Sequence, residues 1–304
     1  MNKTSLPRLL LAGLLAPWGL SAEPVTISTV PFGGMILEIP AGTSVVSDVF
    51  IGSALYQGPV ASVSAEGDVL GMSNVPAIEN PSYIHVLSGD DEGMVSTILE
   101  ADSESVTVET PLNLVEGDIV AIRKHQTIGQ FFAGAALSDF DTVTFYNTDG
   151  KVETLLYFEG NWYDSETEAP SDNTIIFPAE AIVPSLSAGT TLVVSGSVSA
   201  NPVKVEFGAN VVNLIGGLDP VNSPTLNSIF LSALNDFETV TLYNNVNGTL
   251  TSTGTYLRFG DSLFDAFTED PADDVSVEIA SGAVILTSNK GYLHIGAAYS
   301  SSNE

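Results

Sequence analysis

The sequence predicts an all-β protein made of antiparallel, sandwich- or barrel-like modules. Apolar and polar residues alternate over segments such as 25–30, 105–110 and 274–279, which are rich in Val, Ile and Thr. Such alternation is typical of strands with one buried face. Gly, Asn, Asp and Pro interrupt the pattern about every 8–12 residues, which is the turn spacing of sandwiches and barrels. Helical periodicity is scarce, and its best candidate, residues 227–235, is short.

Composition narrows the class of protein further. The chain has 304 residues, with 37 acidic residues against 8 Lys and Arg, a formal net charge of −29, 44% apolar residues and no Cys. This apolar fraction indicates a folded core rather than a disordered acidic tail. The excess of acid argues against a nucleic-acid partner, because binding phosphates requires a basic surface. Without Cys the chain forms no disulfides, thiolate zinc sites or catalytic thiols.

The first 22 residues have the three-part pattern of a secretory signal peptide. Lys3 and Arg8 form a positive start, Leu9 to Leu20 an apolar core, and Ser21-Ala22 a small-residue exit. The apolar run is shorter than the roughly 20 residues that span a bilayer, and we expect no membrane-spanning helix in the mature chain. The sequence therefore predicts a secreted, periplasmic or cell-surface protein.

An internal repeat of about 100 residues organises the second half of the chain. Residues 137–147 match residues 234–244 at eight of eleven positions, at a spacing of 97 residues. Further on, Tyr163-Asp164 matches Phe264-Asp265 at a spacing of 101, so the second copy has a longer hairpin tip. Loop tips tolerate such insertions readily. We therefore expect four segments: a signal peptide at 1–22, an N-terminal β-module at 23–126, a first repeat at 127–213 and a second repeat at 214–304.

Three groups of motifs carry a family resemblance. They are Pro31–Gly34 with Ile39–Thr43, the Ser88-Gly89 and Glu92-Gly93 turns followed by Gly117-Asp118, and the strand Tyr157–Asp164 with its echo at Leu257–Asp265. Together they resemble an uncharacterised family of exported, often multi-copy, repeat-containing bacterial β-proteins of unknown function. The resemblance implies export and β-architecture, and it assigns no catalytic residue.

Motifs for enzymatic chemistry are lacking in the sequence. There is no Gly-x-Ser-x-Gly nucleophile elbow, dinucleotide fingerprint or phosphate-binding loop. The three histidines, His85, His125 and His294, are isolated from one another. We therefore expect no catalysis. A hydrolase assembled from distant residues remains an open alternative, because catalytic groups need not be neighbours in sequence.

Acidic loops are the candidate metal sites, because carboxylate oxygens are ligands that calcium prefers. None of these loops matches an EF-hand or a nonapeptide calcium repeat. The alternative interpretation is a set of solvated turns that repel neighbouring molecules. The candidate calcium ligands are Asp90, Asp91, Glu92, Glu269, Asp270, Asp273 and Asp274.

Aromatic residues form a candidate ligand site in the first repeat. Tyr157, Trp162 and Tyr163 lie close together, and Phe264 is the counterpart of Tyr163 in the second repeat. An exposed cluster of this kind offers a stacking platform for sugars. Alternation places Trp162 and Tyr163 on opposite faces of a strand, so we expect at least one of them to be core.

These observations favour a secreted acidic β-protein with a structural or adhesive role at the cell surface or in the extracellular matrix, without catalysis. A glycan-binding module is the alternative. The two repeats then provide two equivalent sites, which together bind one ligand more tightly than either site alone. The expected partners are an extracellular polysaccharide or a second copy of the chain, which the strand Val25–Val30 would join by strand addition.

The charge predicts that salt stabilises the fold. Self-repulsion of a chain with net charge −29 opposes folding, and added ions screen it. We expect the melting temperature, followed by calorimetry, to rise between low salt and ~0.5 M NaCl. An unchanged midpoint over this range would contradict the prediction.

Overall fold

The computed structural model describes residues 32–217, 225–246, 249–276 and 282–295. The predicted signal peptide at 1–22 and the predicted strand Val25–Val30 lie outside the described residues. Among those that are described, no helix has the length and apolar character needed to cross a membrane.

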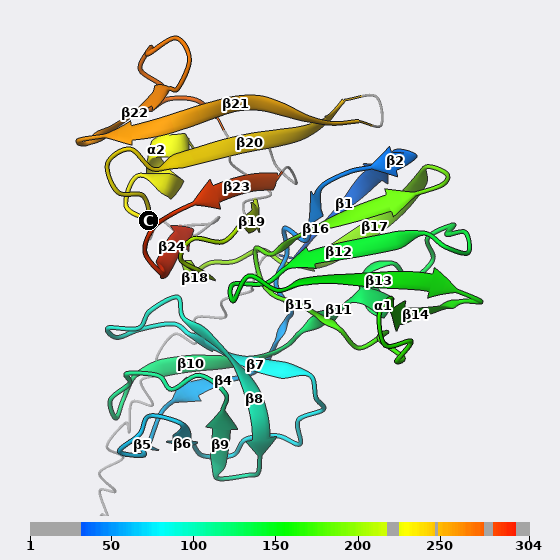
Figure 1. The fold of residues 1–304 in the computed structure, drawn as a ribbon. Coiled ribbons are helices and arrows are strands. Elements are labelled where there is room, and N and C mark those ends of the chain that lie inside the picture. The colour runs from blue at the N-terminus through cyan, green and yellow to red at the C-terminus, as the bar shows by residue number, and fades with distance from the viewer. Residues whose placement is uncertain (1–31, 218–224, 247–248, 277–281, 296–304) are drawn as a thin grey trace, which may run out of the picture.

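Strands dominate the described chain, and all of their pairings are antiparallel, which confirms the predicted all-β class. Figure 1 shows three groups of strands, which meet near the centre of the molecule. We name them the inserted module, the first unit and the second unit, and define each by its elements below.

The inserted module forms one seven-stranded sheet in the order β4-β10-β7-β8-β9-β6-β5. The two strands at the ends of this order, β4 and β5, are separated in the chain only by Val60 and Ala61. They form one bent strand that pairs with β10 at one end and with β6 at the other. The sheet curls around a core that includes Leu70, Ile84 and Val120. The strands are β4 (Ala54–Pro59), β5 (Ser62–Val63), β6 (Val69–Gly71), β7 (Ser82–Val86), β8 (Val95–Ala101), β9 (Ser105–Val108) and β10 (Ile119–Lys124).

The first unit contains a six-stranded sheet in which β14-β13-β12-β16-β2 are neighbours and β3 also pairs with β16. A second layer consists of the ribbon β1–β17 and the pair β11–β15. Its elements are β1 (Phe32–Ile39), β2 (Gly42–Thr43), β3 (Val46–Ser47), β11 (Gln126–Thr127), α1 (Ile128–Phe131), β12 (Thr142–Tyr146), β13 (Val152–Phe158), β14 (Asn161–Asp164), β15 (Ile175–Ile176), β16 (Ala181–Leu186) and β17 (Thr190–Ser197).

The second unit has the same plan. Its five-stranded sheet runs β19-β23-β20-β21-β22, and its ribbon is β18–β24. The helix predicted at 227–235 is present as the shorter α2. The elements are β18 (Val203–Phe207), β19 (Asn213–Gly216), α2 (Leu226–Phe230), β20 (Thr239–Val246), β21 (Thr249–Phe259), β22 (Ser262–Asp265), β23 (Gly282–Leu286) and β24 (Gly291–Ile295).

The two units agree in fine detail as well as in plan. Thr144 and Thr154 bring their hydroxyls within 3.2 Å across β12 and β13, and Thr241 and Thr255 do so within 3.1 Å across β20 and β21. An acidic side chain in each unit ties the loop before the hairpin to the end of the neighbouring strand. Asp141 accepts from the amides of Ser138 (2.8 Å) and Ser187 (2.7 Å), and Glu238 accepts from those of Asn235 (2.7 Å) and Ser288 (2.6 Å).

Strand pairing groups the chain differently from the predicted boundaries at residues 126 and 213. Residues 32–47 were expected to belong to the N-terminal module, yet β1 pairs with β17, and β2 and β3 pair with β16. Likewise β18 was expected in the first repeat, but it pairs with β24. The inserted module therefore lies between β3 and β11 of the first unit. Alternation predicts a strand but not its partner, so sequence reasoning had no signal for these long-range pairings.

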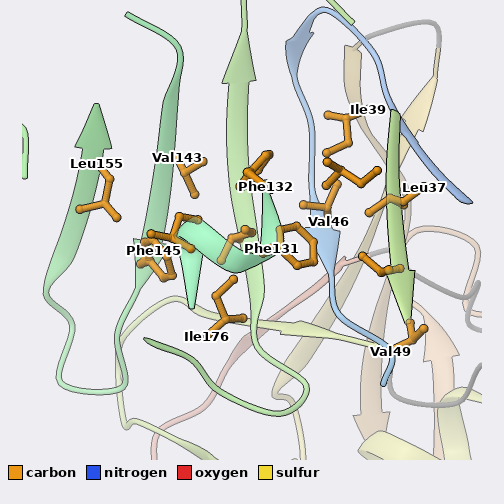
Figure 2. Packing of buried hydrophobic residues seen from close by; sticks show 14 of the residues in the cluster. Leu37, Ile39, Val46, Val49, Phe131, Phe132, Val143, Phe145, Leu155 and Ile176 are labelled. Atoms are coloured by element: carbon orange, nitrogen blue, oxygen red, sulfur yellow. The ribbon is translucent and has the colours of Figure 1, made fainter. Parts of the chain in front are cut away.

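Helix α1 fills the space between the two layers of the first unit. It begins at the N-cap Thr127, whose side chain and that of Gln130 form a capping box. In Figure 2, Phe131 and Phe132 lie between the strands that carry Val143 and Leu155 on one side and the segment that carries Val46 on the other. Trp162 is buried in the same core cluster, against the ring of Phe132.

Trp162 is therefore expected to act as a core residue. Replacing it by Ala removes a large buried side chain and leaves a cavity, so we expect Trp162→Ala to lower the free energy of unfolding by about 3–5 kcal/mol in urea titrations. Trp162→Phe keeps most of the volume and is expected to cost clearly less. If both variants unfolded at the wild-type urea concentration, this assignment of Trp162 would be wrong.

Candidate functional site

One residue of the predicted aromatic site, Trp162, is part of the core. Trp162 is buried, with its ring 5.2 Å from that of Tyr157 and 5.3 Å from that of Phe132. The structure therefore does not present Trp162 to a ligand, and the interpretation of this residue as a stacking platform is wrong. Tyr157, Tyr163 and Phe264 are half-buried, the last two at matching places on β14 and β22. In the second unit Leu263 fills the core position of Trp162.

Many acids of the predicted metal loops hold turns. The carboxylate of Asp265 accepts from the amides of Phe267 (2.8 Å) and Thr268 (2.9 Å), and these hydrogen bonds lower its pKa. Asp164 does the same in the first unit with Thr167 (2.6 Å). Such contacts are those of side chains that stabilise tight turns.

Two of the candidate calcium ligands accept instead from backbone amides of other segments. Asp273 accepts from the amide of Leu263 (2.8 Å), and Asp91 accepts from the amide of Asn113 (2.6 Å). Glu269 adopts a left-handed backbone conformation with φ of 63°. Within the described ranges no three His, Asp or Glu side chains gather as a set of metal ligands. The remaining candidates, Asp90, Glu92, Asp270 and Asp274, lie in the same loops. Calcium binding stays a prediction.

Each unit exposes a pair of phenylalanines that sequence reasoning missed. In the first unit Phe140 is 69% and Phe158 36% exposed, and their ring centroids are 5.6 Å apart. In the second unit Phe237 is 68% and Phe259 56% exposed, again with 5.6 Å between centroids. We call these the paired phenylalanines. Both pairs occupy matching positions, on the loop before the first hairpin strand and at the end of the second.

The backbone holds the first member of each pair in a strained conformation. Phe140 and Phe237 have φ of 74° and 70°, in the left-handed region that bulky residues rarely adopt. The amide of Phe140 donates to the carbonyl of Tyr157 (2.8 Å), and that of Phe237 donates to the carbonyl of Arg258 (2.8 Å). The loop thus extends the hairpin and presents the ring at its surface.

An acid beside each pair joins the loop to the turn between β13 and β14 in the first unit, or between β21 and β22 in the second. Asp139 accepts from the amide of Glu159 (3.0 Å), and Asp236 accepts from the amide of Gly260 (2.9 Å). The paired phenylalanines are therefore positioned from both sides before any ligand arrives. The repeated Asp-Phe dipeptide in both copies was the available sequence signal. Its exposure was hidden because the alternation around it is that of an ordinary strand.

The three groups of strands enclose a cleft of about 500 Å³. Residues of the inserted module, including Thr97, line it together with Tyr146 and Glu180 of the first unit and Tyr292 of the second. One carboxylate oxygen of Glu180 accepts from the amide of Phe177 (2.8 Å). Burial, with a smaller contribution from the nearby Glu153, raises the pKa of Glu180 to about 7.

Two histidines lie where the inserted module meets the units. The ring of His125 packs between those of Tyr83 (4.7 Å) and Phe177 (5.1 Å), and Nε2 of His85 is 3.0 Å from the carbonyl oxygen of Pro202. Burial lowers the pKa of both to about 4, so both imidazoles are neutral at pH 7. Nearby, the guanidinium of the buried Arg123 donates to the carbonyl of Gly52 (2.7 Å), which ties together the two ends of the insertion.

Comparison of the chain with protein-family models, with curated proteins and with solved structures finds no match.

The raised pKa of Glu180 predicts that replacing this residue by its neutral isostere Gln stabilises the fold by an amount that depends on pH. An acid whose pKa is about 7 when folded and 4.5 when unfolded loses stability as pH rises between these values, because ionisation is unfavourable only in the folded state. We expect Glu180→Gln to melt above wild type, with a difference that grows from pH 4.5 to 7 and is constant above it. Calorimetry across this range measures the difference.

Glu153→Gln is the companion variant. Removing this neighbouring charge is expected to lower the pKa of Glu180, so the stability difference should develop at lower pH. A Glu180→Gln difference that is the same at every pH would contradict the burial of Glu180.

Proposed function

We propose that the chain is a secreted structural or adhesive protein, without catalysis, of the cell surface or extracellular matrix, and that it attaches to its target at two equivalent points. The observation that carries the proposal is the presence of matching paired phenylalanines in both units. Export rests on the pattern of residues 1–22, and the resemblance to exported β-proteins is in agreement with it.

Strain and exposure support a binding role for the pairs. A Phe with φ near 70° costs stability, and its ring is largely exposed, so the apolar surface that it buries offsets little of that cost. A single case could be an accident of one loop. The same residue in the same conformation in both units favours a contact made with another molecule, because backbone strain is typically retained where it serves a function.

Two points of attachment suit adhesion to a repetitive surface. Once one pair is bound, the second meets its target at a high effective concentration, so the whole chain binds more tightly than either unit. Each pair is fixed by its backbone contacts, which lowers the ordering cost of binding. A structural or adhesive protein gains most from weak contacts that act together.

An uncharged polysaccharide is the partner that the surroundings favour, and glycan binding is accordingly our second candidate function. The apolar face of a sugar ring can pack on an exposed aromatic ring. Asp139 and Glu159 beside the first pair, and Asp236 beside the second, provide acceptors for sugar hydroxyls. The net charge of −29 disfavours polyanionic glycans and anionic lipid surfaces.

The test uses Phe140→Asn and Phe237→Asn, singly and together, on an array of neutral and acidic polysaccharides and on whole cells. Each single variant is expected to bind the neutral target about 100-fold more weakly because avidity is lost, and the double variant is expected not to bind. Asn tolerates the left-handed conformation, so the variants should be at least as stable as wild type.

Val152→Asn is the matched control, because Val152 is an exposed apolar residue at the other end of β13. It should leave binding unchanged. Cell binding that survives the double substitution would overturn the proposal. Loss of cell binding without any array signal would support adhesion and reject the glycan.

A further inference from the structure

The outer edge of β1 has hydrogen-bonding groups that are unpaired among the residues that the structure describes. On the far side of the ribbon, Ser197 exchanges backbone hydrogen bonds with Ile51 (2.9 and 3.0 Å), so its polar groups point away from its partner Phe32. Antiparallel pairs alternate, and Phe32, Gly34 and Ile36 therefore direct their amides and carbonyls away from β17. Among the described residues no backbone hydrogen bond joins this edge to another segment.

The face beside this edge is apolar and exposed. Phe32 is 68%, Ile36 67% and Val193 80% exposed, and Ile36 lies directly opposite Val193. β1 contains no Lys or Pro, and its one charge, Glu38, is near its end. Natural edge strands are usually protected by such residues, so this strand lacks the devices that prevent association.

The second unit shows what occupies the matching edge there. Ser187 and Ser288 make matching contacts, so Thr191 of β17 corresponds to Tyr292 of β24. Glu38 lies opposite Thr191 and Glu206 lies opposite Tyr292. Glu38 therefore corresponds to Glu206, and Ile36, two residues earlier, corresponds to Lys204. The amide of Lys204 donates to the carbonyl of Gly93 (2.7 Å), so the inserted module covers the edge of β18. That surface of the inserted module is thereby occupied by β18 and is not available to the edge of β1.

The edge of β1 is complementary to itself. A two-fold axis at Gly34 places Phe32 of one copy opposite Ile36 of the other, on the same face, with both residues in hydrogen-bonding positions. Gly34 has no side chain, which leaves room for the rings beside the axis. Glu38 lies four residues from the axis, so the two copies of Glu38 are at opposite ends of the interface.

We propose that β1 pairs with β1 of a second copy in antiparallel register about Gly34, to form a two-fold dimer with a continuous β17–β1–β1–β17 sheet. Such an interface is closed, so it gives dimers rather than filaments. It does not depend on the paired phenylalanines, and it brings two chains, each with two attachment points, into one particle. Because each copy carries a large excess of acidic residues, the dimer is expected to tighten as salt screens the repulsion.

The first experiment measures the mass of the mature chain, residues 23–304, by sedimentation equilibrium in 0.15 M and 0.5 M NaCl. Wild type is expected to be dimeric, with the smaller dissociation constant at high salt. Ile36→Lys places a charge opposite Phe32 at two symmetric places and should raise the dissociation constant about 100-fold. Val152→Lys, on an exposed residue of β13, is the matched control and should remain dimeric.

A second variant tests the register directly, since the chain has no Cys of its own. In the proposed pair the two Gly34 Cα atoms are about 5.5 Å apart, within disulfide range. Gly34→Cys should form a covalent dimer under mild oxidation, and Val152→Cys should not. A wild-type chain that stays monomeric at ~100 µM in both salts would overturn the proposal. A dimer that Ile36→Lys leaves intact and Gly34→Cys does not cross-link would also overturn it.

Discussion

The closure of each unit by a ribbon between its first and last strands is the constraint on which the rest of the structure depends. β1 pairs with β17 along its whole length, from Phe32 opposite Ser197 to Ile39 opposite Thr190, and β18 pairs with β24 in the same way. The inward side chains Leu37 and Leu192 of the first ribbon join the cluster that contains Trp162. Because the ribbon secures both ends of the unit around its core, the chain between β3 and β11 is free to accommodate a whole module. The same ribbon makes β1 an outer strand, so closure of the core and exposure of an edge are two results of one pairing.

Alternation was sufficient to predict the class of fold, but it was insufficient to predict partners. The period of two at 105–110 predicted β9 because a half-buried strand requires that pattern. Alternation of this kind does not tell whether a strand such as β1 pairs with a neighbour in sequence or with β17, since the pattern is the same in either case. The same limit applies to the aromatic residues. Alternation separated Trp162 from Tyr163, but only the position of Phe132 in the folded unit determines that Trp162 points inward. The exposure of Phe140 depends on a left-handed backbone, for which its own residue type is a contrary signal.

The acids of this chain act in large part on its own backbone. Glu238 is an example: partial burial raises its pKa, but the hydrogen bonds from Asn235 and Ser288 outweigh this effect and lower it to about 2. Asp141 makes the matching contacts in the first unit. A carboxylate satisfied by amides needs no Lys or Arg partner, which is consistent with the presence of only 8 cations beside 37 acids. The turns that looked like cation sites in the sequence are in several cases already occupied by the amides of the chain itself.

The contact between Arg123 and the carbonyl of Gly52 bears on the order in which the chain folds. Between Ile39 and Thr190 lie 150 residues, so the first unit must close a long loop, whereas the strands of the inserted module lie closer together in sequence. Once that module has folded, its two ends are adjacent, and the separation that the first unit must bridge is effectively shortened by more than seventy residues, from β4 to β10. We therefore expect the insertion to fold before the first unit closes, so that closure joins two segments already held near each other.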